Sequence, residues 1–381
     1  MNIGSQELSS EDQLRLQVLM QANQVQAIRI DEGAMTLYAL TDKGEARVQL
    51  HANCPAYQYL HRVKEFLAGH VLDSPGGFPV FLKRWARMGQ TADKNIDALL
   101  LLGEPEAVIA VAHAPGLSDE QARRAWWCQP SMDLARCMLE KDTVIQGEMG
   151  KVLASFLVEH LPFEQDLDAR MHTIRLVLHG KLTDEAATAR LWRQGKTMPY
   201  YYIGFLEFMP ENLPQDQPER TDFSEAEALL SPLIASGNGL AERLLSLLNA
   251  NGQTWLKATS EALAQPSTSL AVYAILDAIS RYFYATGYPL RAEKLEDIFP
   301  QAESMVKNRA GQPGALTELL SVAPQFTRSI QAMLALSALT GKLGDPWLFR
   351  NSQVGGLIRR KIEPMVKPTQ IELDILKSAG R

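Results

Sequence analysis

The sequence predicts a mostly α-helical protein, an irregular array of helical hairpins with a small three-stranded antiparallel meander near the N-terminus. Apolar residues recur at the helical period over most of the chain, and glycine or proline punctuates nearly every gap between these segments. Alternation of period two occurs in one place, residues 25–50, where Asp/Gly turns separate short extended runs. The helical segments vary in length without a fixed repeat, which favours an irregular array over a repeat family.

The N-terminal part is expected to combine one helix with the meander. Ser10 and Gln13 have the spacing of a capping box, which predicts the start of a helix. The three expected strands are Val25–Ile30, Met35–Leu40 and Ala46–Leu50. Because three strands enclose little core by themselves, this sheet must pack against helices.

Residues 103–139 predict three short helices joined by tight turns. Gly103 can close the preceding helix, and Pro105 suits the first position of the next one. Ser118 and Gln121 form a second capping box. Ser131, after a Gln-Pro pair, is a good cap for the third helix, so the segment is expected to stack as antiparallel hairpins.

The length of 381 residues favours two domains over one. Pro210–Asp222 contains three prolines and five charged residues, and we interpret it as an exposed, mobile linker that proteases cut first. The expected domains are therefore residues 1–209 and an all-helical domain of residues 223–381. Three adjacent tyrosines, residues 200–202, cannot share one face, so at least one is expected at a surface or an interface.

Composition narrows the class of function. The net charge of −6 argues against a general nucleic-acid binder, although residues 342–381 hold eight Lys/Arg against four Asp/Glu. The N-terminus lacks the basic and apolar regions of a signal peptide, and no apolar run approaches the roughly 18 residues of a membrane helix. Three cysteines without a Cys-x-x-Cys pair exclude a disulfide framework. We expect a cytoplasmic protein without a membrane partner.

The residues that could carry chemistry match no standard catalytic or metal-binding spacing. His113 lies 15 residues before Cys128, and Cys137 follows nine residues later, which fits no zinc pattern. We therefore expect no metal, no cofactor and no catalytic residue. A structural role for both cysteines is favoured, and a reactive thiol at Cys128 or Cys137 remains the alternative. The chain also lacks a P-loop, a zincin motif, a Rossmann glycine triplet and a nucleophile elbow, which lowers the expectation of an enzyme.

Residues 123–127 give a stronger indication of function than the cysteines do, because they predict a surface that binds a partner protein. Adjacent tryptophans on a helix point about 100° apart. One of Trp126 and Trp127 can therefore face the core while the other faces a partner. Arginine pairs favourably with indole, and both residue types are enriched at binding hot spots. The candidate residues are Arg123, Arg124, Trp126, Trp127 and, in the preceding loop, His113. Two core tryptophans beside solvated arginines are the alternative.

Three strings also carry a family resemblance: DSPGGFPVFLKRWARMGQ, LLLLGEPEAVIAVAHAPGLSDEQARRAWW and MGKVLASFLVEHLPFE. Their order resembles the DsrS family, encoded with the reverse dissimilatory sulfite reductase of sulfur-oxidising bacteria. The resemblance implies a cytoplasmic accessory or regulatory role in oxidising stored sulfur, and it brings no catalytic residues to transfer. Three scattered cysteines cannot supply the four thiolates of an iron–sulfur cluster.

The function expected from these observations is a non-catalytic accessory protein that acts through contacts with a protein of the sulfur-oxidation pathway. One alternative is a thiol-dependent enzyme or sulfur carrier that uses Cys128 or Cys137. The other is an RNA-linked regulator that uses the basic segment Arg350–Lys367.

Overall fold

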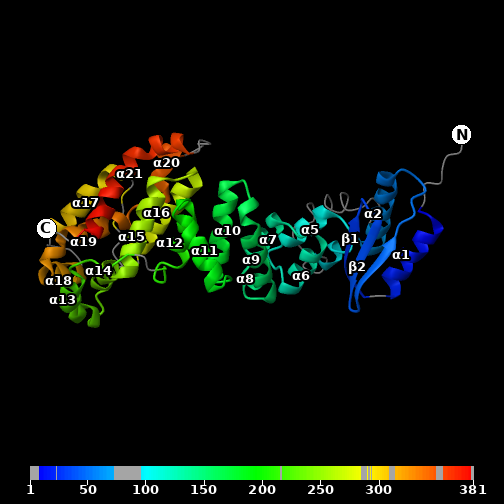
Figure 1. Cartoon of the computed structure of the whole chain (residues 1–381), viewed down its shortest axis with the longest axis horizontal. Helices are drawn as coiled ribbons and strands as arrows, with labels where there is room; N and C mark the ends of the chain where they lie inside the picture. Colours follow the sequence, from blue (N-terminus) through cyan, green and yellow to red (C-terminus); the bar gives the residue numbers. More distant parts are fainter. Residues whose placement is uncertain are drawn as a thin grey trace. The chain divides into compact units, whose positions relative to one another are not determined.

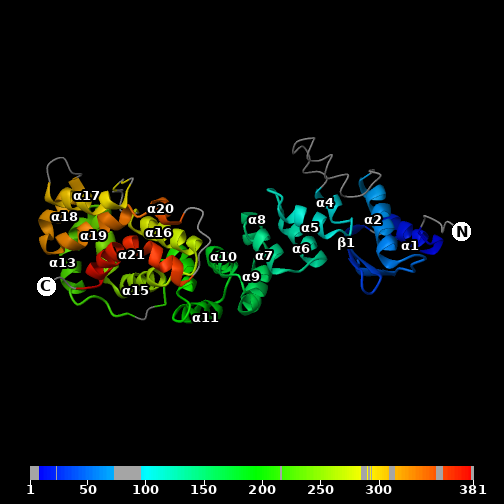
Figure 2. The same cartoon turned by 90° about the horizontal axis from the view of Figure 1, so that it is seen from above.

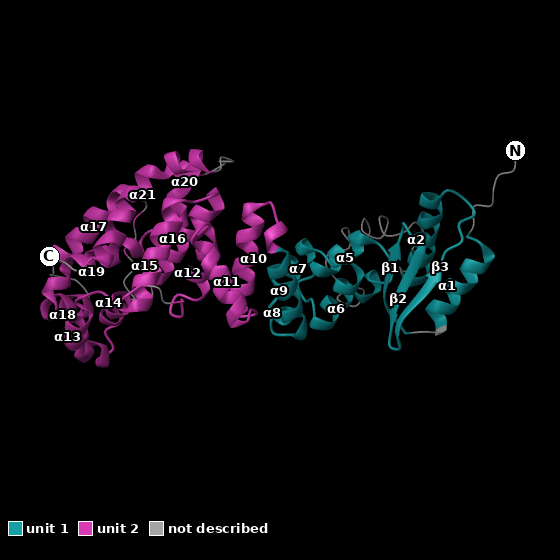
Figure 3. Cartoon of the chain, in the orientation of Figure 1, with its two compact units in different colours: residues 1–160 teal, residues 161–381 magenta. Residues whose placement is uncertain are grey.

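The computed structural model confirms the predicted fold class: helices dominate the described residues, and a three-stranded antiparallel sheet lies near the N-terminus (Figure 1). The chain forms two compact units, residues 1–160 and residues 161–381, coloured separately in Figure 3. The structure describes residues 8–22, 24–72, 96–214, 217–284, 290, 292, 294–308, 314–348 and 355–378. The first family string, residues 73–90, and residues 350–354 of the basic segment lie outside these ranges.

The sheet of the first unit is the predicted meander. Its strands β1 (Val25–Asp31), β2 (Thr36–Thr41) and β3 (Gly44–Gln49) pair in the order β1-β2-β3. The third strand begins two residues earlier than expected because Thr41 pairs with Gly44 across a tight turn, where Gly44 adopts a φ of 109°.

Two helices accompany the sheet, α1 (Ser10–Ala22) and α2 (Ala56–Leu72). Ile28, Leu37 and Ala39 of the inner sheet face are buried in one cluster with Leu16 of α1 and Leu67 of α2. The sheet therefore relies on helices for its core, as its small size requires.

Short helices follow, and two of the predicted caps are confirmed there. At α1 the expected capping box of Ser10 and Gln13 is wrong, because the Ser9 hydroxyl accepts from the Asp12 N–H and Ser10 is the first helical residue. Ser118 and Gln121 form the predicted capping box, and the Ser131 hydroxyl accepts from the Leu134 N–H. In addition, Asp119 caps the helix that begins at Glu148. Its carboxylate accepts from the backbone N–H groups of residues 148 and 149. The helices are α4 (Ile96–Leu99), α5 (Pro105–Ala112), α6 (Asp119–Cys128), α7 (Met132–Met138), α8 (Asp142–Ile145) and α9 (Glu148–His160).

The segment between α4 and α5 lies along the outer edge of β1. The Ile28 N–H donates to the Leu100 carbonyl at 2.8 Å. Gly103 has a φ of 66°, and a Cβ there would lie 2.8 Å from the Ile30 side chain. A glycine is therefore required at this close approach.

The second unit is helical throughout its described part. Trp255 and Phe283, both fully buried, pack edge to face in its core. Figure 2 shows α15 and α21 running side by side. The helices are α10 (Leu167–His179), α11 (Glu185–Gly195), α12 (Tyr202–Phe208), α13 (Phe223–Ala235), α14 (Gly239–Leu248), α15 (Ala250–Ala264), α16 (Ser269–Tyr284), α17 (Leu295–Lys307), α18 (Gly314–Val322), α19 (Thr327–Ser337), α20 (Asp345–Leu348) and α21 (Gly356–Lys377), with short 3₁₀ turns at Leu161–Phe163, Pro199–Tyr201, Pro324–Phe326 and Gly341–Gly344.

The predicted division at Pro210–Asp222 differs from this arrangement, because that segment belongs to the second unit. Leu213 is buried, and its N–H donates to the Asn251 side chain, which in turn donates to the Pro210 carbonyl. Arg220 is buried and donates to backbone carbonyls at the end of α21. The segment is thus tied to α15 through the backbone of Pro210 and Leu213, and to α21 through Arg220.

The prediction that one of the three adjacent tyrosines is exposed was wrong. Tyr200, Tyr201 and Tyr202 are all buried. The 3₁₀ turn Pro199–Tyr201 runs directly into α12, so the three rings point in different directions, and each is covered by neighbouring parts of the unit.

Candidate functional site

Helix α6 positions the candidate partner-binding residues. Ala122 and Ala125 are buried, which turns the arginines and tryptophans to the flanks of the helix. Trp126 is partly buried and packs edge to face on Phe156 of α9, with ring centroids 4.8 Å apart. Phe156 also stacks on His160 at 4.0 Å. Trp126 thus joins two helices of the first unit.

Trp127 turns the other way and contacts the outer face of the sheet. The Arg29 guanidinium lies 4.7 Å from the centre of the Trp127 ring system and 4.9 Å from that of Tyr38. Both the Trp127 indole N–H and the Arg29 guanidinium donate to the Glu45 carboxylate, at 3.2 and 2.9 Å. One arginine therefore joins two aromatic rings through favourable cation–π contacts.

Arg123 continues this row of side chains. Its guanidinium binds the Glu120 carboxylate through two hydrogen bonds of 2.7 Å, and it donates to the Gln26 side chain of β1 at 3.1 Å. We call the row Tyr38, Arg29, Trp127 and Arg123 the arginine–aromatic strip.

The carboxylate at one end of the strip is held in its charged form. Hydrogen bonds from Arg123, and then from Arg124, outweigh the effect of partial burial and lower the pKa of Glu120 to about 2. Arg124 donates to Glu120 at 2.8 Å. The two arginines that the sequence singled out are therefore oriented by one acidic residue a turn earlier on the same helix.

The arginine–aromatic strip remains accessible. The side chains of Arg29, Glu45 and Arg123 expose 38%, 41% and 43% of their surface, and Tyr38 and Trp127 are partly exposed. A partner could reach these groups without displacing any core residue. Of the predicted residues, the structure brings Arg123 and Trp127 together with Arg29, Tyr38 and Glu45, which sequence reasoning missed.

His113 does not join the strip. It is exposed at the C-terminal end of α5, and its side chain forms no hydrogen bond, ion pair or ring contact with the described residues of α6.

The two candidate thiols both face backbone carbonyls. Cys128 Sγ lies 3.5 Å from the Ile28 carbonyl oxygen, and burial raises the pKa of this thiol to about 12. Cys137 is buried with its Sγ 3.4 Å from the Ala112 carbonyl oxygen, and burial raises its pKa too. Over the described residues, no three His, Cys, Asp or Glu side chains gather as a metal site would require.

A buried polar cluster in the first unit also escaped the sequence analysis. Asp12 has no exposed surface and accepts from the Tyr59 hydroxyl at 2.5 Å and from the His51 backbone N–H at 2.6 Å. The His51 ring nitrogen Nδ1 lies 3.2 Å from the same carboxylate. The cluster fastens α1 to α2 and to His51, the second residue after β3. An acidic residue in a first helical turn was its only local signal, and such residues are common there.

Within the described parts of the chain, no helix combines the length and the apolar character needed to cross a membrane. No family model, curated protein or solved structure matches this chain.

Proposed function

We propose that this chain is a non-catalytic accessory protein that binds another protein through the arginine–aromatic strip. The resemblance to DsrS supports a cytoplasmic role in dissimilatory sulfur oxidation. The observation that carries the proposal is the strip itself, in which accessible tyrosine, tryptophan and arginine side chains form one continuous row across the sheet and α6.

The composition of the strip supports a binding role, because tyrosine, tryptophan and arginine dominate the energetics of protein interfaces. Its geometry supports it as well. Arg29 is held between two rings and a carboxylate, and Arg123 is held by Glu120 and Gln26. Side chains that are already ordered lose little conformational entropy on binding.

The charges of the strip indicate the kind of contact. Arg29 is paired with Glu45, and Arg123 is paired with Glu120, which also binds Arg124. We expect a partner that stacks on the rings and completes hydrogen bonds, and an association rate with little dependence on salt.

The thiol-dependent alternative has less support. A pKa of about 12 leaves Cys128 protonated at neutral pH, and the thiolate is the nucleophilic form. Cys137 is buried and has its pKa raised in the same direction.

A substitution in the strip tests the proposal. Affinity purification from the native cell with mass spectrometry identifies the partner, and calorimetry then measures its dissociation constant for purified variants. We expect Trp127→Ala to weaken binding by about 2 kcal/mol, which is about 30-fold. Arg123→Glu should weaken it as well, because it reverses a charge in the strip.

Tyr57→Ala is the matched control, since Tyr57 is an aromatic residue on α2 that exposes 72% of its surface outside the strip. It should bind the partner as the parent does. Unchanged affinity of both Trp127→Ala and Arg123→Glu, with circular dichroism spectra like the parent's, would rule out the strip as the contact.

A further inference from the structure

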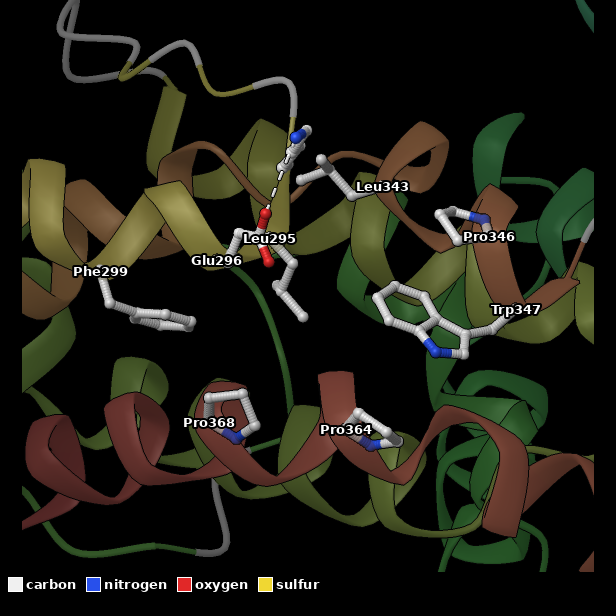
Figure 4. A pocket seen from close by; sticks show the side chains of 9 residues that line it. Leu295, Glu296, Phe299, Leu343, Pro346, Trp347, Pro364 and Pro368 are labelled. Carbon is white, nitrogen blue, oxygen red and sulfur yellow. Dashed lines mark ion pairs between the residues drawn. The ribbon is translucent and has the colours of Figure 1, made fainter.

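The second unit contains an apolar pocket of about 540 Å³ between α17, α20 and α21. Figure 4 shows Trp347 and Phe299 on one side of it and two prolines of α21 on the other. This volume lies in the range of ligand-binding pockets. Its apolar lining includes Leu295, Phe299, Leu343, Trp347, Pro364 and Pro368.

The apolar surface continues along α21 beyond the pocket. At 100° per residue, Leu357 and Ile371 fall on the same face of the helix as Pro364 and Pro368. Leu357 exposes 58% of its surface and Ile371 exposes 57%, although the opposite face of α21 is buried in the unit. From Leu357 to Ile371 this face is about 21 Å long. We call this face, together with the pocket, the α21 groove.

The two prolines change the hydrogen bonding on this face. Pro364 and Pro368 have no N–H, so the carbonyls of Arg360 and Pro364 lack their α-helical donors. Each of these carbonyls lies one helical turn toward the N-terminus from a proline ring that faces the pocket. The two acceptors are four residues apart, about 6 Å along the helix. N–H groups on one side of an extended chain repeat every two residues, about 6.6 Å, which is a close match.

Positive charge borders the same face. Arg360 and Lys361 are exposed, lie on either side of Pro364 around the helix, and form no ion pair with any described residue. Lys367 and Lys294 are already paired, with Glu363 and Glu296. The uncompensated charge beside the groove is therefore cationic, and it favours an acidic occupant.

We infer that the α21 groove binds an extended segment of another protein in which apolar residues alternate with glutamate or aspartate. The apolar side chains enter the pocket against Trp347 and Phe299, and the backbone N–H groups donate to the carbonyls of Arg360 and Pro364. The acidic side chains face Arg360 and Lys361. Single-stranded RNA matches the charge, but its phosphodiester backbone has no regular N–H donors for the two carbonyls. This inference is independent of the arginine–aromatic strip.

The test uses the full-length chain and a fluorescein-labelled ten-residue peptide that alternates glutamate with leucine and phenylalanine. Fluorescence anisotropy should show saturable binding. A peptide with lysine in place of glutamate should bind at least tenfold more weakly. A peptide with alternate backbone nitrogens methylated should also lose about tenfold, because it keeps the side chains and loses the donors.

Protein variants complete the test. Pro364→Ala with Pro368→Ala restores two helical N–H groups, so the melting temperature should stay equal or rise while peptide affinity falls about tenfold. Arg360→Glu should weaken binding, whereas Arg190→Glu on the exposed side of α11 should not.

Three results would each overturn the inference. One is absence of binding by the alternating peptide, and another is equal affinity for the methylated peptide, which tests the unaltered protein and so does not depend on the folding of a variant. The third is tighter binding of a labelled ten-nucleotide oligouridine that displaces the peptide, which would assign the groove to RNA.

Discussion

At the scale of the residue, Asp12 is a carboxylate buried among three donors, the Tyr59 hydroxyl and two groups of His51. Burial alone would raise its pKa, but the hydrogen bonds from Tyr59, His51 and Ser9 lower it below the usual 3.8. Because the folded-state pKa is lower than the unfolded one, this carboxylate stabilises the fold at neutral pH. That contribution is lost as the pH falls below about 4 and through the folded-state pKa.

We predict that Asp12→Ala lowers the free energy of unfolding by about 2–4 kcal/mol at pH 7, because it leaves buried donors without their acceptor. The difference from the parent should narrow at pH 3, which lies below the usual pKa of 3.8, because the carboxyl of the unfolded parent is then mostly protonated and the folded state loses this advantage. Urea unfolding at both pH values measures it. Glu65→Ala, an exposed acidic change on α2, should stay within about 0.5 kcal/mol of the parent. A difference that is the same at both pH values would contradict the proposed ionic role.

The thiols give a second prediction at this scale. With the pKa of Cys128 near 12, iodoacetamide at pH 7.5 should leave Cys128 unmodified in the folded protein and label it fully in guanidinium chloride. Peptide mass spectrometry locates the label. Replacing Cys128 and Cys137 by alanine should keep partner binding and cost at most about 1–3 kcal/mol of stability. Rapid labelling of Cys128 in the native state would favour the sulfur-carrier alternative.

Single-residue reasoning from sequence identified Arg123 and Trp127 but not what they contact. A pairing of arginine with indole was expected, without a partner arginine being named. The structure instead places Arg29, nearly a hundred residues earlier, over Trp127, and Glu45 below its N–H. Contacts between segments so far apart leave no local pattern, because they depend on how the sheet and α6 pack.

At the scale of the element, the turn between α14 and α15 depends on Gly252. A Cβ at this position would lie 2.1 Å from the Ser246 carbonyl oxygen and 2.6 Å from the Leu247 Cα. Both are backbone atoms of α14, so they cannot move aside as a flexible side chain would. The close approach of these two helices therefore requires glycine.

We predict that Gly252→Ala destabilises the protein by about 2–3 kcal/mol through this overlap. Gly69→Ala is the matched control, since Gly69 lies in α2 and a Cβ added there would meet no atom within 4 Å. The control should gain about 0.5–1 kcal/mol, because alanine favours a helix over glycine. Thermal unfolding followed by circular dichroism compares the two. Equal stability of both variants would show that the turn can relax.

Short sequence patterns predicted helix starts well where the interacting residues lie close together in the sequence. The capping box of Ser118 and Gln121 formed as expected because both partners lie within one helical turn. Helix α21 shows the limit. Pro364 and Pro368 suggest a break, yet the helix runs from Gly356 to Lys377 through both prolines. Burial of one continuous face, from Ile358 to Leu376, outweighs the two missing hydrogen bonds.

At the scale of the whole molecule, we predict that residues 161–381 unfold cooperatively as a separate fragment and that residues 223–381 do not. The shorter fragment lacks α12, which packs on α15 and α16 and whose Leu206 carbonyl lies 3.4 Å from the indole nitrogen of the fully buried Trp255. Thermal melts and binding of a hydrophobic dye compare the fragments. If residues 223–381 melt as sharply and at the same temperature, the boundary expected from sequence is the better one.

The structure divides after His160 and not at Pro210–Asp222, and this difference has a physical reason. Prolines and charges in Pro210–Asp222 are typical of a linker, and the same residues also suit a segment whose side chains bond to helix ends. Arg220 is the decisive case, because it is 5% exposed and donates to the carbonyls of Leu376 and Ser378. Those acceptors lie more than 150 residues away in sequence. The composition of a short segment around Arg220 therefore gives no indication of them.

The hydrogen bond between Ile28 and Leu100 has a consequence for self-association. A small sheet exposes unpaired strands at its two sides, and such strands can recruit strands from other molecules into aggregates. On one side, residues 100–103 occupy part of the edge of β1. On the other side, β3 carries the charged residues Glu45 and Arg47, which oppose such recruitment. A protein shortened to residues 1–72 would keep the whole meander and both of its helices, yet it would open the β1 side and become prone to aggregate.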